Sequence, residues 1–207
     1  MLRKDNKDYY FDYLLNTQKW PQSWYHQEKL QMTQKLVTEL PIGSKILDAA
    51  CGTGHITAKY SNDYQIYGTD VEPESINYCK TKYKGNFRLA SLYDKLPYKD
   101  NFFDLILFHD SIEHFKKPKI ALKNLSRVLK PYRKICVSTI NYGNPMWTIL
   151  ENTWHRTVAG NCRTFSEDTH PSRYTIKLLR NHCNSYFQEI ELSKRVFMME
   201  LFYIGKK

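Results

Sequence analysis

The sequence predicts an α/β protein whose mostly parallel sheet carries helices on both faces. From Ser44 onward, short apolar runs alternate with segments of helical periodicity, a pattern typical of βα units. The first run ends at Asp48 and leads directly into a turn of small residues. Such a turn lets backbone amides approach a nucleotide-like ligand without obstruction by side chains. Near the C-terminus, two further apolar runs joined by a short polar link around Lys194 indicate a hairpin.

The individual elements follow in order along the chain. An aromatic stretch leads into a helix that is expected to end near Leu40, before a hinge at 41–43. A helix is expected directly after the small-residue turn, and two others begin at Pro73 and Pro118, because proline is favoured at the first helical position. Pro131 is expected to stop the last of these helices. The expected strands are Lys45–Ala49, Gln65–Thr69, Asn86–Ala90, Phe103–Phe108, Lys134–Thr139, Phe187–Ser193 and Val196–Ile204.

Length and composition bound the class of protein. The 207 residues, 42% of them hydrophobic, suffice for one domain with a full core. The N-terminus lacks the apolar stretch of a signal peptide, and no later segment resembles a membrane span, so a soluble cytoplasmic protein is expected. The five cysteines form no C-x-x-C pair. Reduced thiols are therefore expected, with neither a disulfide framework nor a metal site.

The chain is strongly basic, with a formal net charge of +10 and a pI near 9.3. This charge favours anionic partners such as nucleic acids, phosphorylated metabolites or acidic lipid surfaces. The positive residues are scattered along the sequence, however, and are locally dense only at 116–119 and 130–134. A lysine-rich solvated surface is the simpler explanation.

The small-residue turn carries a family resemblance. The segment Lys45–Tyr60, KILDAACGTGHITAKY, resembles the first motif of class I S-adenosylmethionine-dependent methyltransferases, often spelled D-x-G-C-G-T-G, with Ala50 at the first glycine. No third glycine completes a dinucleotide fingerprint, which argues against an oxidoreductase. The resemblance implies S-adenosyl-L-methionine as cofactor, S-adenosyl-L-homocysteine as product, and a Rossmann-like seven-stranded sheet with an antiparallel last strand. It assigns cofactor contacts to Asp48, Ala49, Ala50, Cys51, Gly52, Thr53 and Gly54.

Two further segments extend the predicted cofactor site. Asp70 ends a strand about twenty residues beyond the turn, the separation expected for a carboxylate that accepts hydrogen bonds from ribose hydroxyls. The resemblance places Val71 against the adenine. It also places Ser91 where the family normally has an aspartate beside the adenine amino group, with Leu92 next to it. A hydroxyl accepts that hydrogen bond less strongly than a carboxylate does.

The candidate catalytic residues follow the fourth strand. Residues 102–115 resemble the family's D-L-I-L…E-H-F segment, at the crevice where open α/β sheets bind ligands. His109 is expected beside the cofactor and the reactive methyl as a general base, with Asp110 orienting it or accepting the proton directly. His155 and His170, which lie in the long insertion before the terminal hairpin, are alternative bases.

The resemblance covers Ser44 to about Asn141 and is closest to the small-molecule branch that includes ubiquinone-biosynthesis O-methyltransferases. Glu113 and His114 of its E-H-F sequence are expected to form a structural pair. Trp20, Trp24 and Tyr25 are expected either to cover the cofactor, where a ring can face the sulfonium cation, or to pack in the core. The expected single domain divides into an N-terminal helical lid (1–43), a cofactor-binding core (44–141), an acceptor-cap insertion (142–186) and a terminal hairpin (187–207).

The implied reaction is in-line transfer of an activated methyl to a small-molecule acceptor, through an oxygen nucleophile and without a metal. Several alternatives stay open. The charge suggests RNA methylation, although no N-P-P-[FYW] tetrapeptide follows the fourth strand. Methylation of a protein, or a cofactor-binding pseudoenzyme that departs from the family at Ala50 and Ser91, is also compatible with the sequence. The amphipathic run 145–150 could meet an apolar or membrane-associated acceptor. The sequence leaves the acceptor and the oligomeric state open.

Overall fold

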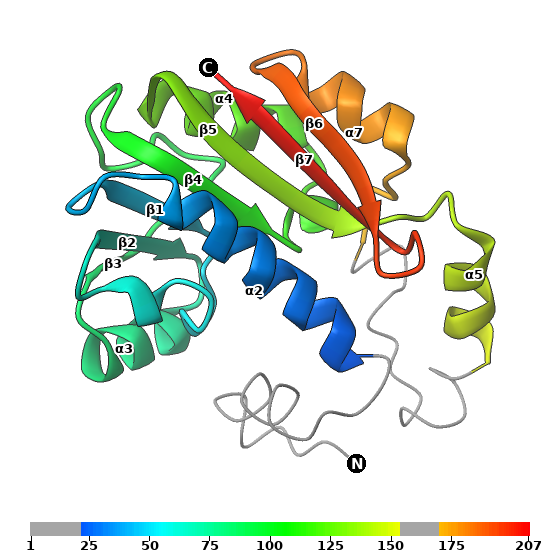
Figure 1. The fold of residues 1–207 in the computed structure, drawn as a ribbon, viewed down its shortest axis with the longest axis horizontal. Coiled ribbons are helices and arrows are strands. Elements are labelled where there is room, and N and C mark those ends of the chain that lie inside the picture. Colours follow the sequence, from blue (N-terminus) through cyan, green and yellow to red (C-terminus); the bar gives the residue numbers. More distant parts are fainter. Residues whose placement is uncertain (1–21, 154–169) are drawn as a thin grey trace.

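The computed structural model describes residues 22–153 and 170–207. Its centre is a seven-stranded sheet in the order β3-β2-β1-β4-β5-β7-β6 (Figure 1). The five strands β1 to β5 pair in parallel, and β7 is antiparallel to both of its neighbours. The strands are β1 (Lys45–Ala49), β2 (Gln65–Asp70), β3 (Asn86–Leu89), β4 (Phe103–His109), β5 (Leu129–Ile140), β6 (Gln188–Arg195) and β7 (Glu200–Lys206). The predicted fold class is confirmed.

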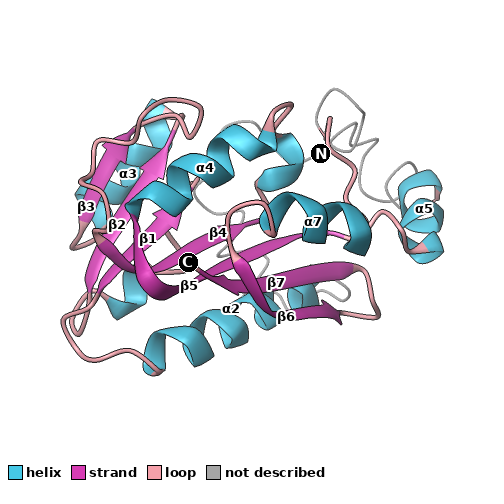
Figure 2. Cartoon of the chain, turned by 90° about the horizontal axis from the view of Figure 1, so that it is seen from above, coloured by secondary structure: helices cyan, strands magenta, loops and turns pink. Residues whose placement is uncertain are grey.

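Helices cover both faces of the sheet (Figure 2). Neighbouring residues of β1 point to opposite faces, so Ile46 and Leu47 belong to two different apolar clusters, as expected for a strand buried on both sides. One cluster includes apolar side chains of α4 and α7, and the other includes those of α2 and α3. The helices are α2 (Gln22–Thr38), α3 (Pro73–Lys82), α4 (Pro118–Val128), α5 (Pro145–Asn152) and α7 (Ile176–Cys183), with short 3-10 turns η2 (Ala58–Tyr60) and η3 (Ile112–His114).

The terminal hairpin turns later than predicted. Lys194 lies within β6, and the link between β6 and β7 is formed by 196–199. Val196, Phe197 and Met198 all have positive φ angles, of 49°, 53° and 64°. The prediction of a polar link around Lys194 is wrong. The turn is built from apolar residues, and their side-chain pattern by itself predicts a strand.

Two further boundaries differ from the predicted ones. After the small-residue turn the structure has only the 3-10 turn η2 in place of the expected helix. Helix α4 ends at Val128 and passes directly into β5, so Pro131 lies inside a strand and does not stop the helix. The register of β5 shifts against β4 near this point, and Tyr132 has a φ of 61°. The irregular start of β5 therefore explains why a strand beginning only at Lys134 was expected.

Helix α2 belongs to the predicted lid, but it packs as a core element. Its side chains Met32, Leu36 and Val37 are buried in the cluster that includes β1 and β4 residues. Within the described ranges, no helix is both long and apolar enough to cross a bilayer. The acceptor-cap insertion contributes α5 and α7, and its residues 154–169 lie outside the described chain.

Candidate functional site

The turn after β1 adopts the left-handed backbone conformation three times. Ala50, Gly52 and Gly54 have φ angles of 57°, 50° and 75°. Glycine accepts this conformation without strain, whereas alanine does not. The Cys51 amide donates to the Thr69 carbonyl at 2.9 Å, which joins the turn to β2. A Cβ added at Gly52 would meet no atom within 4 Å. The turn therefore leaves open space for a ligand to approach the backbone.

Asp70, the predicted ribose-binding acid, lies against this turn. Its Oδ2 accepts a hydrogen bond from the Gly52 amide at 2.8 Å, and its Oδ1 accepts one from the Glu72 amide at 3.0 Å. A carboxylate has about four lone-pair sites, so both oxygens retain capacity for ligand hydroxyls. Val71 follows directly and is 63% exposed. The structure thus joins the predicted turn and the predicted acid into one cradle at the carboxyl edge of the sheet.

Asp48 lies behind the cradle and is buried. Thr57 donates its hydroxyl to the Asp48 Oδ2 at 2.7 Å. Burial raises the pKa of Asp48 to about 7, nearby Asp70 adds to this shift, and the Thr57 hydrogen bond opposes it. Thr57 was not among the predicted residues, because only the fold brings a hydroxyl nine positions later back onto the strand end.

Ser91 and Leu92 form the third predicted part of the cofactor site, and both make hydrogen bonds within the protein. Ser91 is half-buried, and its hydroxyl accepts a hydrogen bond from the Tyr93 amide at 3.1 Å. The Leu92 side chain packs in the core, and its carbonyl accepts from the Asn124 side chain at 2.9 Å. The Leu92 side chain is enclosed by protein, and the predicted recognition of adenine by this residue stays a prediction. Ser91 stays a prediction.

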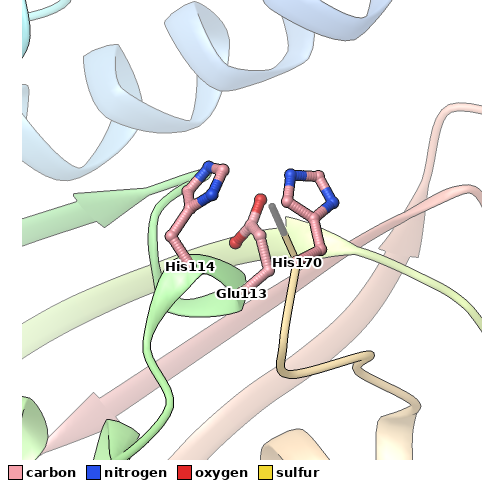
Figure 3. Close-up of side chains that lie close together, drawn as sticks. All are labelled: Glu113, His114 and His170. Atoms are coloured by element: carbon pink, nitrogen blue, oxygen red, sulfur yellow. The ribbon is translucent and has the colours of Figure 1, made fainter. Parts of the chain in front are cut away.

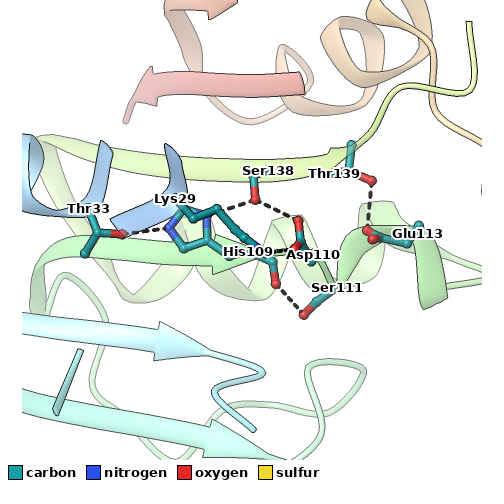
Figure 4. Close-up of polar contacts among 8 residues, drawn as sticks. All are labelled: Lys29, Thr33, His109, Asp110, Ser111, Glu113, Ser138 and Thr139. Atoms are coloured by element: carbon teal, nitrogen blue, oxygen red, sulfur yellow. Dashed lines mark hydrogen bonds and ion pairs between the residues drawn. The ribbon is translucent and has the colours of Figure 1, made fainter. Parts of the chain in front are cut away.

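His109 ends β4 beneath helix α2, as Figure 4 shows. Its ring is buried, with Nε2 at 3.2 Å from the Thr33 hydroxyl and Nδ1 at 3.0 Å from the Ser138 hydroxyl. Burial, assisted by Lys29 and opposed by Asp110, lowers the pKa of His109 to about 4. Both ring nitrogens therefore have protein partners and the ring is neutral. These contacts join α2 to the sheet, and the predicted roles of His109 as general base and as cofactor contact stay predictions.

Asp110 follows with a φ of 42°. Its Oδ2 forms an ion pair with the Lys29 ammonium, and its Oδ1 accepts a hydrogen bond from the Ser138 hydroxyl at 3.1 Å (Figure 4). Burial alone would raise the pKa of Asp110, but the Lys29 ammonium outweighs burial and holds this pKa below its usual range. Asp110 is therefore ionised at neutral pH. Lys29, Thr33 and Ser138 were not among the predicted site residues, because only the fold brings them together with His109 and Asp110.

Beyond β4, Glu113, His114 and His170 come together (Figure 3). Glu113 is buried, and its Oε2 accepts from the Thr139 hydroxyl at 2.8 Å. Burial, with a contribution from Asp110, raises the pKa of Glu113 to about 8. His170 is buried beside Tyr142, and burial lowers its pKa to about 4. The expected pair of Glu113 and His114 thus gains a third member from the insertion.

The remaining predicted residues belong to the N-terminal stretch and to the insertion. Trp20 and His155 lie outside the described residues. Trp24 and Tyr25 lie in the first turns of α2, and their predicted contact with the cofactor stays a prediction.

Glu200 on β7 was not predicted at all. It is fully buried, and within the described chain neither of its carboxylate oxygens has a hydrogen-bond partner. Burial, with a smaller contribution from Asp110, raises the pKa of Glu200 well above its usual range.

Comparison with known sequences supports the prediction that this chain binds S-adenosyl-L-methionine. Residues 47–137 match the sequence model of the family described as "Methyltransferase domain". A Schizosaccharomyces pombe protein, uncharacterized methyltransferase C1B3.06c, is 34% identical over 113 residues, which cover 44% of this chain and 38% of that protein. The ubiquinone/menaquinone biosynthesis C-methyltransferase UbiE of Shewanella sp. (strain W3-18-1) is 30% identical over 122 residues, covering 54% of this chain and 48% of UbiE. The chain spans less than half the length of both curated relatives.

Solved structures share the fold. One is a chain from the complex between the Haloferax volcanii Trm112 methyltransferase activator and a methyltransferase, with a TM-score of 0.71, 13% identity, and coverage of 100% of this chain and 99% of that one. Another is a TehB-like SAM-dependent methyltransferase from Corynebacterium glutamicum, with a TM-score of 0.62, 18% identity, and coverage of 84% and 86%. The relatives support the class but not the predicted O-methyltransferase branch. The chain has the class I methyltransferase fold, residues 47–137 match the methyltransferase domain, and the cofactor that they indicate is S-adenosyl-L-methionine.

Proposed function

We propose that this protein transfers the methyl group of S-adenosyl-L-methionine to a small-molecule acceptor by in-line displacement. The observation that carries the proposal is the cradle in which Asp70 receives the Gly52 amide at 2.8 Å. Its carboxylate would accept hydrogen bonds from the ribose hydroxyls, and the open backbone at Gly52 would receive the amino-acid tail. Val71 would lie against the adenine, with Ser91 at its polar edge.

The cofactor supplies a methyl group that is already activated by a sulfonium cation. The chain must then hold the acceptor in line with that methyl and exclude water, and positioning of this kind can lower a barrier by about 7–11 kcal/mol. Asp110 stands at the end of β4 with its side chain 24% exposed. We assign it the acceptor's hydrogen bond, because it is ionised and its φ of 42° directs the chain away from the strand. Lys29 and Ser138 would hold its carboxylate in place.

Oxygen is the proposed nucleophile because a carboxylate next to the methyl can accept a hydroxyl proton as the new bond forms. The relatives named UbiE are C-methyltransferases, so an activated ring carbon is the alternative acceptor atom. The hydroxyl beside such a carbon would need the same acceptor to take its proton. Acceptors that offer both atoms, such as substituted phenols, would therefore distinguish the two reactions by the position of the new methyl.

The test has two stages, binding and transfer. Isothermal titration of the folded full chain with S-adenosyl-L-methionine should give one site per chain, and absence of binding would remove the proposal. Radiolabelled cofactor should then label one class within a panel of phenols, hydroxy acids and amines. Binding without transfer to any acceptor, together with a stable protein partner, would instead indicate a cofactor-binding pseudoenzyme.

The second candidate function is methylation of RNA. The net charge of +10 favours it, because neutralised phosphates give an affinity that falls steeply with salt. Retention on immobilised RNA that exceeds retention on a sulfonate exchanger of equal charge density, followed by label transfer to the RNA, would support this candidate. Equal retention on both supports would leave the charge as a property of the solvated surface.

A further inference from the structure

A carboxylate and two imidazoles meet just beyond the end of β4. Glu113 and His114 come from η3, and His170 comes from the segment that precedes α7. One ligand-type atom from each of the three residues lies within 4.8 Å of the other two. Figure 3 shows the two imidazoles on either side of the Glu113 carboxylate, below helix α2. Two histidines and one carboxylate form a ligand set that suits divalent transition metals.

Backbone hydrogen bonds hold the segments that carry these residues together. The Ser172 amide donates to the Glu113 carbonyl at 3.1 Å, and the Tyr142 amide donates to the Tyr174 carbonyl at 2.8 Å. Since η3, the end of β5 and the segment at 170–174 are joined in this way, the three side chains are positioned by main chain and not by chance contact of flexible surface groups. Such preorganisation is what a metal site requires of its protein.

Two of the three side chains also have an orienting partner behind them. Thr139 donates its hydroxyl to the Glu113 Oε2 at 2.8 Å. The Tyr142 hydroxyl lies 2.5 Å from Nδ1 of His170. Ligands to metals usually have outer partners of this kind, which fix the orientation of the ring and raise its basicity. In the tautomer with a proton on Nδ1, the phenol oxygen accepts from Nδ1–H and Nε2 carries the lone pair that a cation needs.

Burial distinguishes the cluster from an ordinary polar surface group. Glu113 is 1% exposed and His170 is 4% exposed, whereas His114 is exposed. The two rings have centroids only 4.5 Å apart at an angle of 72°. Burying a carboxylate and an imidazole costs free energy that a bound cation would offset. The exposed His114 marks the side from which a hydrated cation could enter.

We propose that Glu113, His114 and His170 bind one divalent transition-metal cation of the Zn²⁺ class. Bonds of about 2.0–2.2 Å place tetrahedral ligand atoms roughly 3.3–3.6 Å apart. The three ligand atoms lie within 4.8 Å of one another, so side-chain movements of roughly 1 Å would complete the set. The remaining coordination position would take water or an acceptor oxygen, whose pKa the cation would lower. This last role rests on the proposed methyl transfer, whereas the binding of the cation does not.

The test uses the full chain without added histidines and stripped of metal. Titration with Co²⁺, followed by visible absorption, should show one tetrahedral site per chain, and calorimetry with Zn²⁺ should give the same stoichiometry. His170→Ala and Glu113→Gln should each weaken binding more than about tenfold, and Tyr142→Phe should weaken it about 10–100-fold. His182→Ala, which changes a histidine on α7 that is not part of the cluster, should leave the affinity unchanged.

Folding of each variant is checked by circular dichroism. If His170→Ala does not fold, His114→Ala tests the same site, because His114 is exposed and its loss leaves no buried gap. Equal affinity in wild type and in the three ligand variants would overturn the proposal, as would failure of the folded wild type to bind Co²⁺ or Zn²⁺ at millimolar concentration. Titration of the same samples with S-adenosyl-L-methionine separates the proposed metal site from the proposed methyl transfer. A variant that loses metal binding but still binds the cofactor tests the metal site alone.

Discussion

Lys29 on helix α2 forms an ion pair with Asp110 at the end of β4, 81 positions later in the chain. The lysine is 3% exposed, and the aspartate is 24% exposed. Ser138 of β5 donates to the same carboxylate and accepts from the His109 ring, whose other nitrogen meets Thr33 of α2. This network fixes the N-terminal helix over the carboxyl edge of the sheet, where the proposed acceptor would bind.

Replacement of Lys29 by methionine should destabilise the protein by about 3 kcal/mol. Removing one partner of a buried ion pair leaves the other charge without compensation. Urea unfolding of the ligand-free chain measures the effect, and Lys35→Met on the exposed face of the same helix is the matched control. A loss below about 1 kcal/mol would mean that water reaches Asp110 and compensates its charge.

Replacement of Ala50 by glycine should stabilise the protein by roughly 0.5–1 kcal/mol. Alanine at a φ of 57° has a strain of about 1–2 kcal/mol, which exceeds the extra unfolded-state entropy of glycine. Thermal unfolding measures the change. Ala121→Gly within α4 should do the opposite and lower stability by about 1 kcal/mol, since helix interiors disfavour glycine. Destabilisation by Ala50→Gly would show that the turn is not left-handed at this position.

Replacement of Asp70 by alanine should weaken binding of S-adenosyl-L-methionine by about 10–100-fold. Hydrogen bonds to a charged acceptor are each worth about 1.5–3 kcal/mol, and this substitution also releases the Gly52 amide that Asp70 holds. Calorimetry gives the dissociation constant. Asp63→Ala, at an exposed aspartate before β2, should bind like the wild type. Unchanged affinity in Asp70→Ala would disprove the assignment of Asp70 to the ribose.

Replacement of Asp48 by asparagine should alter the pH dependence of stability. The folded-state pKa of Asp48 is about 7, above its ordinary value of 3.8. An acid whose pKa is raised by folding contributes stability that is complete below pH 4 and is lost as the pH rises through 7. The wild type should therefore lose roughly 2–4 kcal/mol more than Asp48→Asn between pH 4 and pH 8. Asparagine can still accept from Thr57, so the comparison isolates the charge.

The contribution of Asp48 is read as the difference between the two unfolding curves. Glu113 and Glu200 titrate in the same direction, because burial raises the pKa of both, but they are common to wild type and variant. Parallel curves across this pH range would show that Asp48 is hydrated in the folded protein.

Much of the cofactor-binding core (44–141) was predictable, because the sequence patterns that indicate its elements are local. The bounds of β1 and the start of α3 at Pro73 were predicted correctly, since an apolar run followed by small residues, and a proline ahead of a helical pattern, each act within a few positions. The hairpin turn at 196–199 was not predicted. Its residues are apolar and so resemble a strand in sequence, whereas their positive φ angles are visible only in the structure.

The sequence by itself determined the order of the strands along the chain and the placement of Gly52 and Asp70 at one edge, because parallel βα units bring their strand ends to the same side. Only the tertiary structure decided that His109 is enclosed, that Lys29 neutralises Asp110, and that His170 reaches Glu113. These partners are separated by 57 to 81 positions. Burial and pairing over such separations depend on how helices pack across the sheet, which no local pattern encodes.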